Sequence, residues 1–210
     1  MPVTVTSDKD NNEIILSDDN GQQYRLSYKY DEGFLFNDTE YGWVIKDNNG
    51  NELTDSNRQA GEDFIINAFN EKGDEISKIA QDVILKRMLD TDGVDPNAEE
   101  KIGMQDLRSV QKSISDSRYI AYYRDEQRKP GTEIGHDLLL KALNVKAFYG
   151  AFKHARDNDL LDSQETANSF SKLFRESDIK FATNILKKYD GTANNLIALL
   201  PTLTLNEQEK

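Results

Sequence analysis

The hydrophobic pattern of the first 55 residues predicts a small antiparallel sheet. Short runs of β-forming residues occur at 13–16, 24–28, 33–36 and 41–45. Between the first two runs lies Ser17-Asp18-Asp19-Asn20-Gly21, which indicates a turn because Asn-Gly tolerates positive φ. A second polar turn follows at 47–51. We therefore expect a sheet of about four or five strands, which is a common size.

From Thr54 onward the apolar pattern becomes helical. Asp55 or Ser56 is a suitable cap for a helix to about Phe69, and Asp74 for the next helix. That second helix places apolar residues on one face at a spacing of three or four, namely Ile76, Ile79, Ala80, Val83, Ile84 and Met88. Further helices are predicted at about 104–123, 133–144, 146–156, 163–174, 178–189 and 193–200. The fold class is therefore α+β, with a β segment at 1–55, a helical domain at 56–201 and a loose tail at 202–210.

Composition and charge narrow the classes of function. The chain has 210 residues with a net charge of −12, and residues 1–55 hold twelve acidic but only four basic side chains. An acidic chain repels phosphate backbones, so we expect no nucleic-acid partner but another protein, one that presents a basic surface. The absence of cysteine excludes disulfides, thiolate zinc sites, iron–sulfur clusters and a cysteine nucleophile.

Localisation follows only in outline from the sequence. No apolar run approaches the length of about 18 residues that a transmembrane helix needs, so no membrane span is expected. The N-terminus shows no Sec-type signal, which predicts a cytoplasmic protein or one exported without a cleaved signal peptide. The cysteine-free composition, rich in Asp and Asn, suits a bacterial protein that is exported unfolded.

An acidic loop carries the main chemical signal. The helical run 85–89 is followed by Asp90-Thr91-Asp92-Gly93, and a second helical run begins near Met104. Hard divalent cations prefer six to eight oxygen ligands, supplied by carboxylates at alternate loop positions and by the outgoing helix. Asp90 and Asp92 have the alternate spacing, and Asp106 is expected to reach back from the first turn of the exit helix.

The stretch 85–114 resembles an EF-hand. The matching positions are the first and third loop acids, the following glycine, the eighth-position apolar residue and the last acid, which are Asp90, Asp92, Gly93, Ile102 and Asp106. The resemblance implies a Ca²⁺ or Mg²⁺ site formed by Asp90, Asp92, Asp95, Ile102 and Asp106, with Ile102 at a short β-bridge. The loop has seventeen residues instead of twelve, and the insertion within 94–100 leaves the fifth and seventh ligands unassigned. The terminal Asp, shorter than the usual Glu, weakens Ca²⁺ binding and lets Mg²⁺ compete better.

A second stretch, 158–165, is similar to the second half of an EF-hand loop. Leu161 falls at the eighth position, Asp162 at the ninth and Glu165 at the twelfth. The first and third positions are His154 and Arg156, which are not oxygen ligands, so this hand is expected to be degenerate. A weaker second site is formed in this interpretation by Asp159, Asp162 and Glu165. EF-hands commonly pair through the eighth-position bridge, and Ile102 and Leu161 are 59 residues apart, farther than in a compact pair.

A plain structural explanation of both loops stays open. Asp and Gly are common loop residues, Asp95-Pro96 is a good helix cap with a first-turn proline, and 157–159 is typical of a helix C-terminal turn. The two histidines lie on separate predicted helices, and no nucleophile-elbow, P-loop or dinucleotide motif occurs. We expect a non-enzymatic binding or regulatory protein with an EF-hand-like cation site. The alternative is a metal-independent interaction protein, such as a secreted effector, inhibitor or immunity-type protein, that uses its acidic surface.

Overall fold

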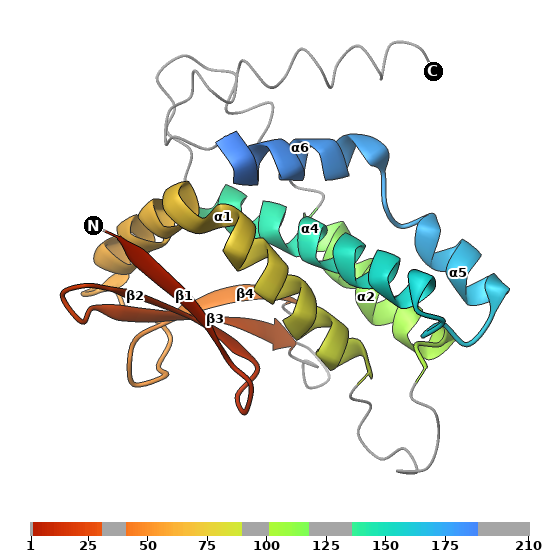
Figure 1. Cartoon of the computed structure of the whole chain (residues 1–210), viewed down its shortest axis with the longest axis horizontal. Coiled ribbons are helices and arrows are strands. Elements are labelled where there is room, and N and C mark those ends of the chain that lie inside the picture. Colours follow the sequence, from red (N-terminus) through yellow and green to blue (C-terminus); the bar gives the residue numbers. More distant parts are fainter. Residues whose placement is uncertain (1, 31–40, 90–100, 118–135, 189–210) are drawn as a thin grey trace.

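The computed structural model describes residues 2–30, 41–89, 101–117 and 136–188 (Figure 1). An antiparallel sheet at the N-terminus is followed by helices, which confirms the α+β prediction. The described elements are β1 (Val3–Asp8), β2 (Glu13–Asp18), β3 (Gln23–Tyr30), β4 (Tyr41–Lys46), α1 (Arg58–Leu89), α2 (Met104–Ser117), α4 (His136–Asp157), α5 (Gln164–Ser171) and α6 (Glu176–Lys188).

The four strands pair in the order β1-β2-β3-β4. The β2–β3 hairpin turns at Gly21, whose φ of +80° is the left-handed conformation that the Asn-Gly signal predicts. Strand β1 was not predicted, although its alternating Val and Thr residues are typical of a strand with one buried face. The predicted strand at 33–36 lies outside the described residues.

Helix α1 covers the apolar face of the sheet and packs against β1, β2 and β3 (Figure 1). Within α1, Lys72 has non-helical angles (φ −133°, ψ 24°). This kink separates the two helical segments that the sequence predicts on either side of residues 70–73. The kink changes the direction of α1, so that its second half runs beside α4.

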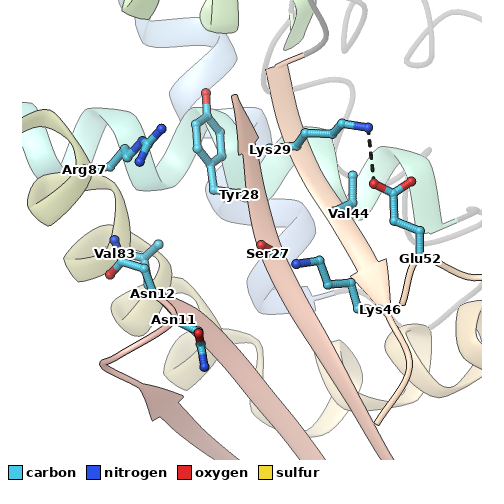
Figure 2. A pocket seen from close by; sticks show the side chains of 10 residues that line it. All are labelled: Asn11, Asn12, Ser27, Tyr28, Lys29, Val44, Lys46, Glu52, Val83 and Arg87. Atoms are coloured by element: carbon cyan, nitrogen blue, oxygen red, sulfur yellow. Dashed lines mark hydrogen bonds and ion pairs between the residues drawn. The ribbon is translucent and has the colours of Figure 1, made fainter. Parts of the chain in front are cut away.

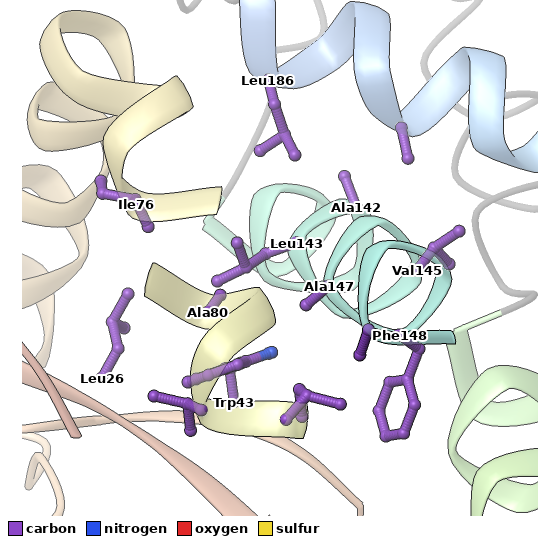
Figure 3. Close-up of a cluster of buried hydrophobic side chains, with 14 of the residues drawn as sticks. Leu26, Trp43, Ile76, Ala80, Ala142, Leu143, Val145, Ala147, Phe148 and Leu186 are labelled. Carbon is purple, nitrogen blue, oxygen red and sulfur yellow. The ribbon is translucent and has the colours of Figure 1, made fainter. Parts of the chain in front are cut away.

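Helix α4 lies beside α1, and α6 packs across both helices (Figure 1). The sequence predicted two helices here, 133–144 and 146–156, but a single helix runs through Asn144 and Val145. No glycine or proline interrupts the chain at this point, and Asn144 is buried with its amide donating to Ser113. Figure 3 shows Leu143 and Ala147 of α4 in the cluster that also includes Ala80 of α1.

The sheet and the helices share one hydrophobic core. Leu26 and Trp43 of the sheet, Ile76 of α1 and Leu186 of α6 all belong to it (Figure 3). Burial of apolar surface from both the strands and the helices contributes to the same core, which favours their folding together. Among the helices that the structure describes, none has an apolar stretch long enough to cross a membrane.

Candidate functional site

The segment between α1 and α2 contains the predicted cation site. Helix α1 ends at Leu89, one residue before Asp90, and α2 begins at Met104. Asp106 is the third residue of α2, so it occupies the first turn of the exit helix as predicted. The predicted ligands Asp90, Asp92 and Asp95 lie outside the described residues, as does the side chain of Asp106.

Ile102 forms a β-bridge with Leu161. The backbone N–H of Ile102 donates to the carbonyl oxygen of Leu160 at 2.8 Å, and the Ile102 carbonyl oxygen accepts from the N–H of Asp162 at 3.0 Å. The side chain of Ile102 is fully buried, at 0 % exposure, and Leu161 is buried too. The predicted β-bridge at Ile102 is therefore confirmed, and its partner is the residue that the resemblance places at the eighth position of the second loop.

The two loops contribute unequally to this bridge. The bridge is parallel, and Ile102 supplies both the donor and the acceptor. In an antiparallel bridge, two facing residues exchange equivalent hydrogen bonds. A local two-fold axis that relates the two loops would require such an exchange, and the observed pattern lacks it. The loops are therefore joined at the expected residues but are not symmetric copies of one another.

The second loop is shorter than an EF-hand loop because α4 extends into it. His154 and Arg156, the first and third positions of the predicted degenerate hand, are both helical. The helix then closes in a C-terminal turn, in which the N–H of Asn158 donates to the His154 carbonyl oxygen at 3.0 Å. Asp159 follows with a φ of +57°, a left-handed conformation that commonly ends helices. The interpretation of 157–159 as a helix C-terminal turn is confirmed.

Side chains after the bridge cap helix α5. The Ser163 hydroxyl oxygen accepts from the N–H of Thr166 at 3.1 Å, which is the usual N-cap hydrogen bond. The Asp162 carboxylate accepts from the Ser163 hydroxyl at 3.0 Å and from the hydroxyl of Thr166. Glu165 is exposed in the first turn of α5, where a negative charge is favourable to the helix dipole.

The weaker second site is not assembled in the structure. The Asp159 side chain is 93 % exposed, and one of its oxygens lies 3.5 Å from the Lys101 ammonium nitrogen. Asp162 accepts hydrogen bonds at the helix cap, and Glu165 lies one helical turn onward. Within the described ranges, no three His, Cys, Asp or Glu side chains form a group that could hold a metal ion. Asp159 forms an exposed ion pair, Asp162 takes part in the cap of α5, and Glu165 lies in the first turn of that helix.

The acidic β segment neutralises part of its own charge. Glu13 lies on the face of the sheet opposite the helices, yet it is only 6 % exposed. Its carboxylate lies 2.8 Å from the Lys46 ammonium and 3.2 Å from the Arg25 guanidinium. Burial raises the pKa of Glu13, but the hydrogen bonds and charges of Lys46 and Arg25 outweigh it, and the pKa is lowered.

Asp8 adds a second carboxylate to the same group. It lies 3.2 Å from Arg25. The pKa of Asp8 is lowered, first by the side-chain and backbone hydrogen bonds that Asn11 donates. The face therefore carries charges of both signs, and among the described residues of the segment Asp19 is an exposed acid in the turn between β2 and β3.

No protein-family model matches the chain, and no match to it was found among the curated proteins or the solved structures. Function is therefore inferred from the residues and their geometry alone.

Proposed function

We propose that this chain is a non-enzymatic binding or regulatory protein with an EF-hand-like site for Ca²⁺ or Mg²⁺ between α1 and α2. The observation that carries the proposal is the bridge between Ile102 and Leu161. It joins two helix–loop–helix segments at the positions through which EF-hands commonly pair. A plain interhelical loop does not require that its penultimate residue form a β-bridge with a residue 59 positions away.

Asp90, Asp92, Asp95 and Asp106 supply the oxygen ligands in this proposal. The backbone supports the assignment at the two ends of the loop, since Asp90 directly follows α1 and Asp106 lies in the first turn of α2. These four carboxylates repel one another without a counter-ion, and a hard divalent cation offsets that repulsion. The Ile102 carbonyl already accepts from Asp162, so we assign Ile102 the role of an anchor that holds the end of the loop.

A bound cation would fix the angle between α1 and α2. The bridge would transmit this constraint to the turn between α4 and α5, because both hydrogen bonds of Ile102 end on that turn. We expect weak affinity, since the loop is enlarged and its terminal carboxylate is the shorter Asp. The role of the ion is therefore structural rather than switch-like.

The test uses the full chain, freed of divalent cations and titrated with CaCl₂ and MgCl₂ by calorimetry and thermal unfolding. We expect a binding heat and a higher melting temperature, with a stabilisation of about 2.7 kcal/mol when the cation is at about 100 times its Kd. Asp90→Asn and Asp106→Asn should each remove both effects. Asp157→Asn is the matched control, because its exposed carboxylate lies at the end of α4 beyond the proposed site, and it should retain them.

The alternative function is a metal-independent protein interaction through the acidic surface. It gains support if the wild-type chain gives no heat and no change in melting temperature with either cation. It also gains support if Asp157→Asn alters the response as strongly as Asp90→Asn does. Within the described part of the sheet, Glu13 is paired with Lys46 and Arg25, so a basic partner would contact exposed turn residues such as Asp19 rather than Glu13.

A further inference from the structure

Strand β1 forms one edge of the sheet, and its outer side carries backbone groups that β2 does not pair. Asp18, which lies opposite Val3, directs its N–H to the carbonyl oxygen of Gln22, next to β3. The pair of Val3 and Asp18 is therefore not hydrogen-bonded. Because bonded and non-bonded pairs alternate along an antiparallel ladder, the backbone groups of Val3, Val5 and Ser7 all point away from β2.

Most of this outer side is open. The N–H of Val3 donates to the Glu71 carboxylate at 2.9 Å. For the outward N–H and carbonyl groups of Val5 and Ser7, the described residues provide no hydrogen-bond partner. Val5 is half-buried and Ser7 is exposed. A strand edge of this kind is a template for the addition of another strand.

The opposite edge of the sheet is covered in part. Lys46 of β4 forms an antiparallel bridge with Glu52, and the N–H of Leu53 donates to the Ile45 carbonyl oxygen at 3.4 Å. Figure 2 shows the side chain of Lys29 reaching from β3 to Glu52, whose carboxylate lies 3.2 Å from the ammonium. The chain therefore folds back along β4, whereas no described segment pairs with the outer side of β1.

The described chain leaves the fold close to the start of β1. Helix α6 ends at Lys188, and the backbone carbonyl oxygen of its residue Leu186 lies against Gly73 of α1. Two residues before Gly73, the Glu71 carboxylate holds the N–H of Val3. Figure 1 shows this end of α6 beside the bend of α1, toward the N-terminus of the chain. A short series of contacts therefore connects Lys188 with the first residue of β1.

The sequence beyond α6 contains a segment whose pattern suits this edge. Residues 202–205, which lie outside the described residues, read Thr-Leu-Thr-Leu and follow Pro201. Residues 3–6 of β1 read Val-Thr-Val-Thr, the same alternation of threonine with an apolar residue. Successive side chains of a strand point to opposite faces of the sheet. Beside β1, both leucines would therefore face the helices together with Val5, and both threonines the open face.

The connection between α6 and this segment is long enough. Thirteen residues, 189–201, join Lys188 to Thr202. They span up to about 45 Å when extended, or about 29 Å if the predicted helix 193–200 forms. The contacts from Lys188 to Val3 span about 25 Å at most. A connection this short keeps the segment at a high local concentration, which favours the chain's own segment over a second molecule.

We propose that residues 202–205 of the same chain pair with the outer side of β1 as an additional strand, instead of forming a loose tail. Entry at the Val3 end makes the added strand parallel to β1. The pairing gives the outward groups of Val5 and Ser7 their partners and closes an edge that otherwise invites another chain. No carboxylate of the proposed cation site takes part, so each of the two proposals can fail without the other.

Amide hydrogen exchange of the full chain, followed by NMR with EDTA present, tests this pairing. The N–H groups of Val5 and Ser7 should exchange at least about tenfold more slowly in the wild type than in Thr204→Pro. Proline at position 204 removes the N–H that faces β1 when both leucines face the helices. Gln208→Pro is the matched control, because it makes the same change outside the segment, and it should keep the wild-type rates.

Two internal references and the state of association complete the experiment. The N–H groups of Thr4 and Thr6 face β2 and should stay slow in every variant, which shows that the sheet is intact. Analytical ultracentrifugation should find the protection of Val5 and Ser7 in the monomer. Equal exchange in the wild type and Thr204→Pro would overturn the proposal, since the edge is then either open or covered by something else. Protection that occurs only in a dimer would also overturn it, and would assign the added strand to a second copy.

Discussion

The backbone of α6 lies close to Gly73 of α1, and this contact predicts the effect of adding one methyl group there. At Gly73 of α1, an added Cβ would overlap the backbone carbonyl oxygen of Leu186 and lie 3.5 Å from its carbonyl carbon. At Gly150 of α4, an added Cβ would meet the side chain of Gln81, with Cδ at 2.8 Å and Cγ at 3.2 Å. Gly73→Ala therefore collides with a fixed helix backbone, whereas Gly150→Ala collides with the end of a flexible side chain.

The two variants should differ in stability by about 2–3 kcal/mol. Alanine stabilises a helix interior by about 1 kcal/mol relative to glycine, and this gain applies to Gly150 but not to Gly73, which directly follows the kink at Lys72. Overpacking against a part of the core that must shift costs about 1–3 kcal/mol, and the backbone at Leu186 places Gly73→Ala in the upper part of that range. Rotation of Gln81 costs about 0.5–1.5 kcal/mol at most. The net change is a loss of about 2–3 kcal/mol for Gly73→Ala and about zero for Gly150→Ala.

Urea unfolding followed by far-UV circular dichroism measures both changes. The midpoint should fall for Gly73→Ala and stay close to the wild-type value for Gly150→Ala, with similar slopes for all three proteins. If Gly73→Ala is as stable as the wild type, α6 does not pack on α1 as closely as described. If both variants lose the same stability, the distinction between a backbone and a side-chain neighbour is wrong.

Two further changes test the polar contacts. Glu13→Gln should cost about 1–3 kcal/mol at neutral pH, because it leaves Lys46 without its carboxylate and Arg25 with Asp8 alone. The pKa of Glu13 is lowered in the folded chain, so its carboxylate contributes stability above its ordinary pKa of 4.5, and this stability is lost as the pH falls through the folded-state pKa. The variant lacks this carboxylate, so its free energy of unfolding should fall less steeply with acid than that of the wild type. An unchanged pH profile of unfolding would contradict this. The Ser113 hydroxyl forms hydrogen bonds with the Tyr28 hydroxyl at 2.7 Å and with the Asn144 amide at 3.0 Å inside the core. Ser113→Ala should therefore lower the free energy of unfolding by about 1–3 kcal/mol, measured by thermal or urea unfolding. A loss well below that range would mean that water takes the place of the hydroxyl group.

Local sequence signals predicted the parts of the fold that depend on local chemistry. The Asn-Gly turn and the helical spacing after Asp74 both have counterparts in the structure. The break predicted between residues 144 and 146 was wrong because tertiary packing overrides a weak local signal: Asn144 is a poor helix former in water, but its buried amide bonds to Ser113. Strand β1 was not predicted because only two of its six residues, Val3 and Val5, are apolar, which makes its alternation a weak signal.

The candidate site was predictable in part. Ile102 could be identified because an EF-hand loop places an apolar residue at a fixed position before the exit helix, and its bridge exists. The direction of the bridge and the extension of α4 through Arg156 depend on how the helices pack, which local spacing does not encode.

A calcium titration that follows the backbone amides at the bridge tests the proposed cation site most directly. The amides of Ile102 and Asp162 make the two hydrogen bonds that join the helix–loop–helix segments. If a cation binds between Asp90 and Asp106, both amide signals should shift together and saturate with Ca²⁺ or Mg²⁺ in the wild-type chain, and should not respond in Asp90→Asn. Signals that stay in place while the protein is otherwise folded would contradict a cation site coupled to this bridge.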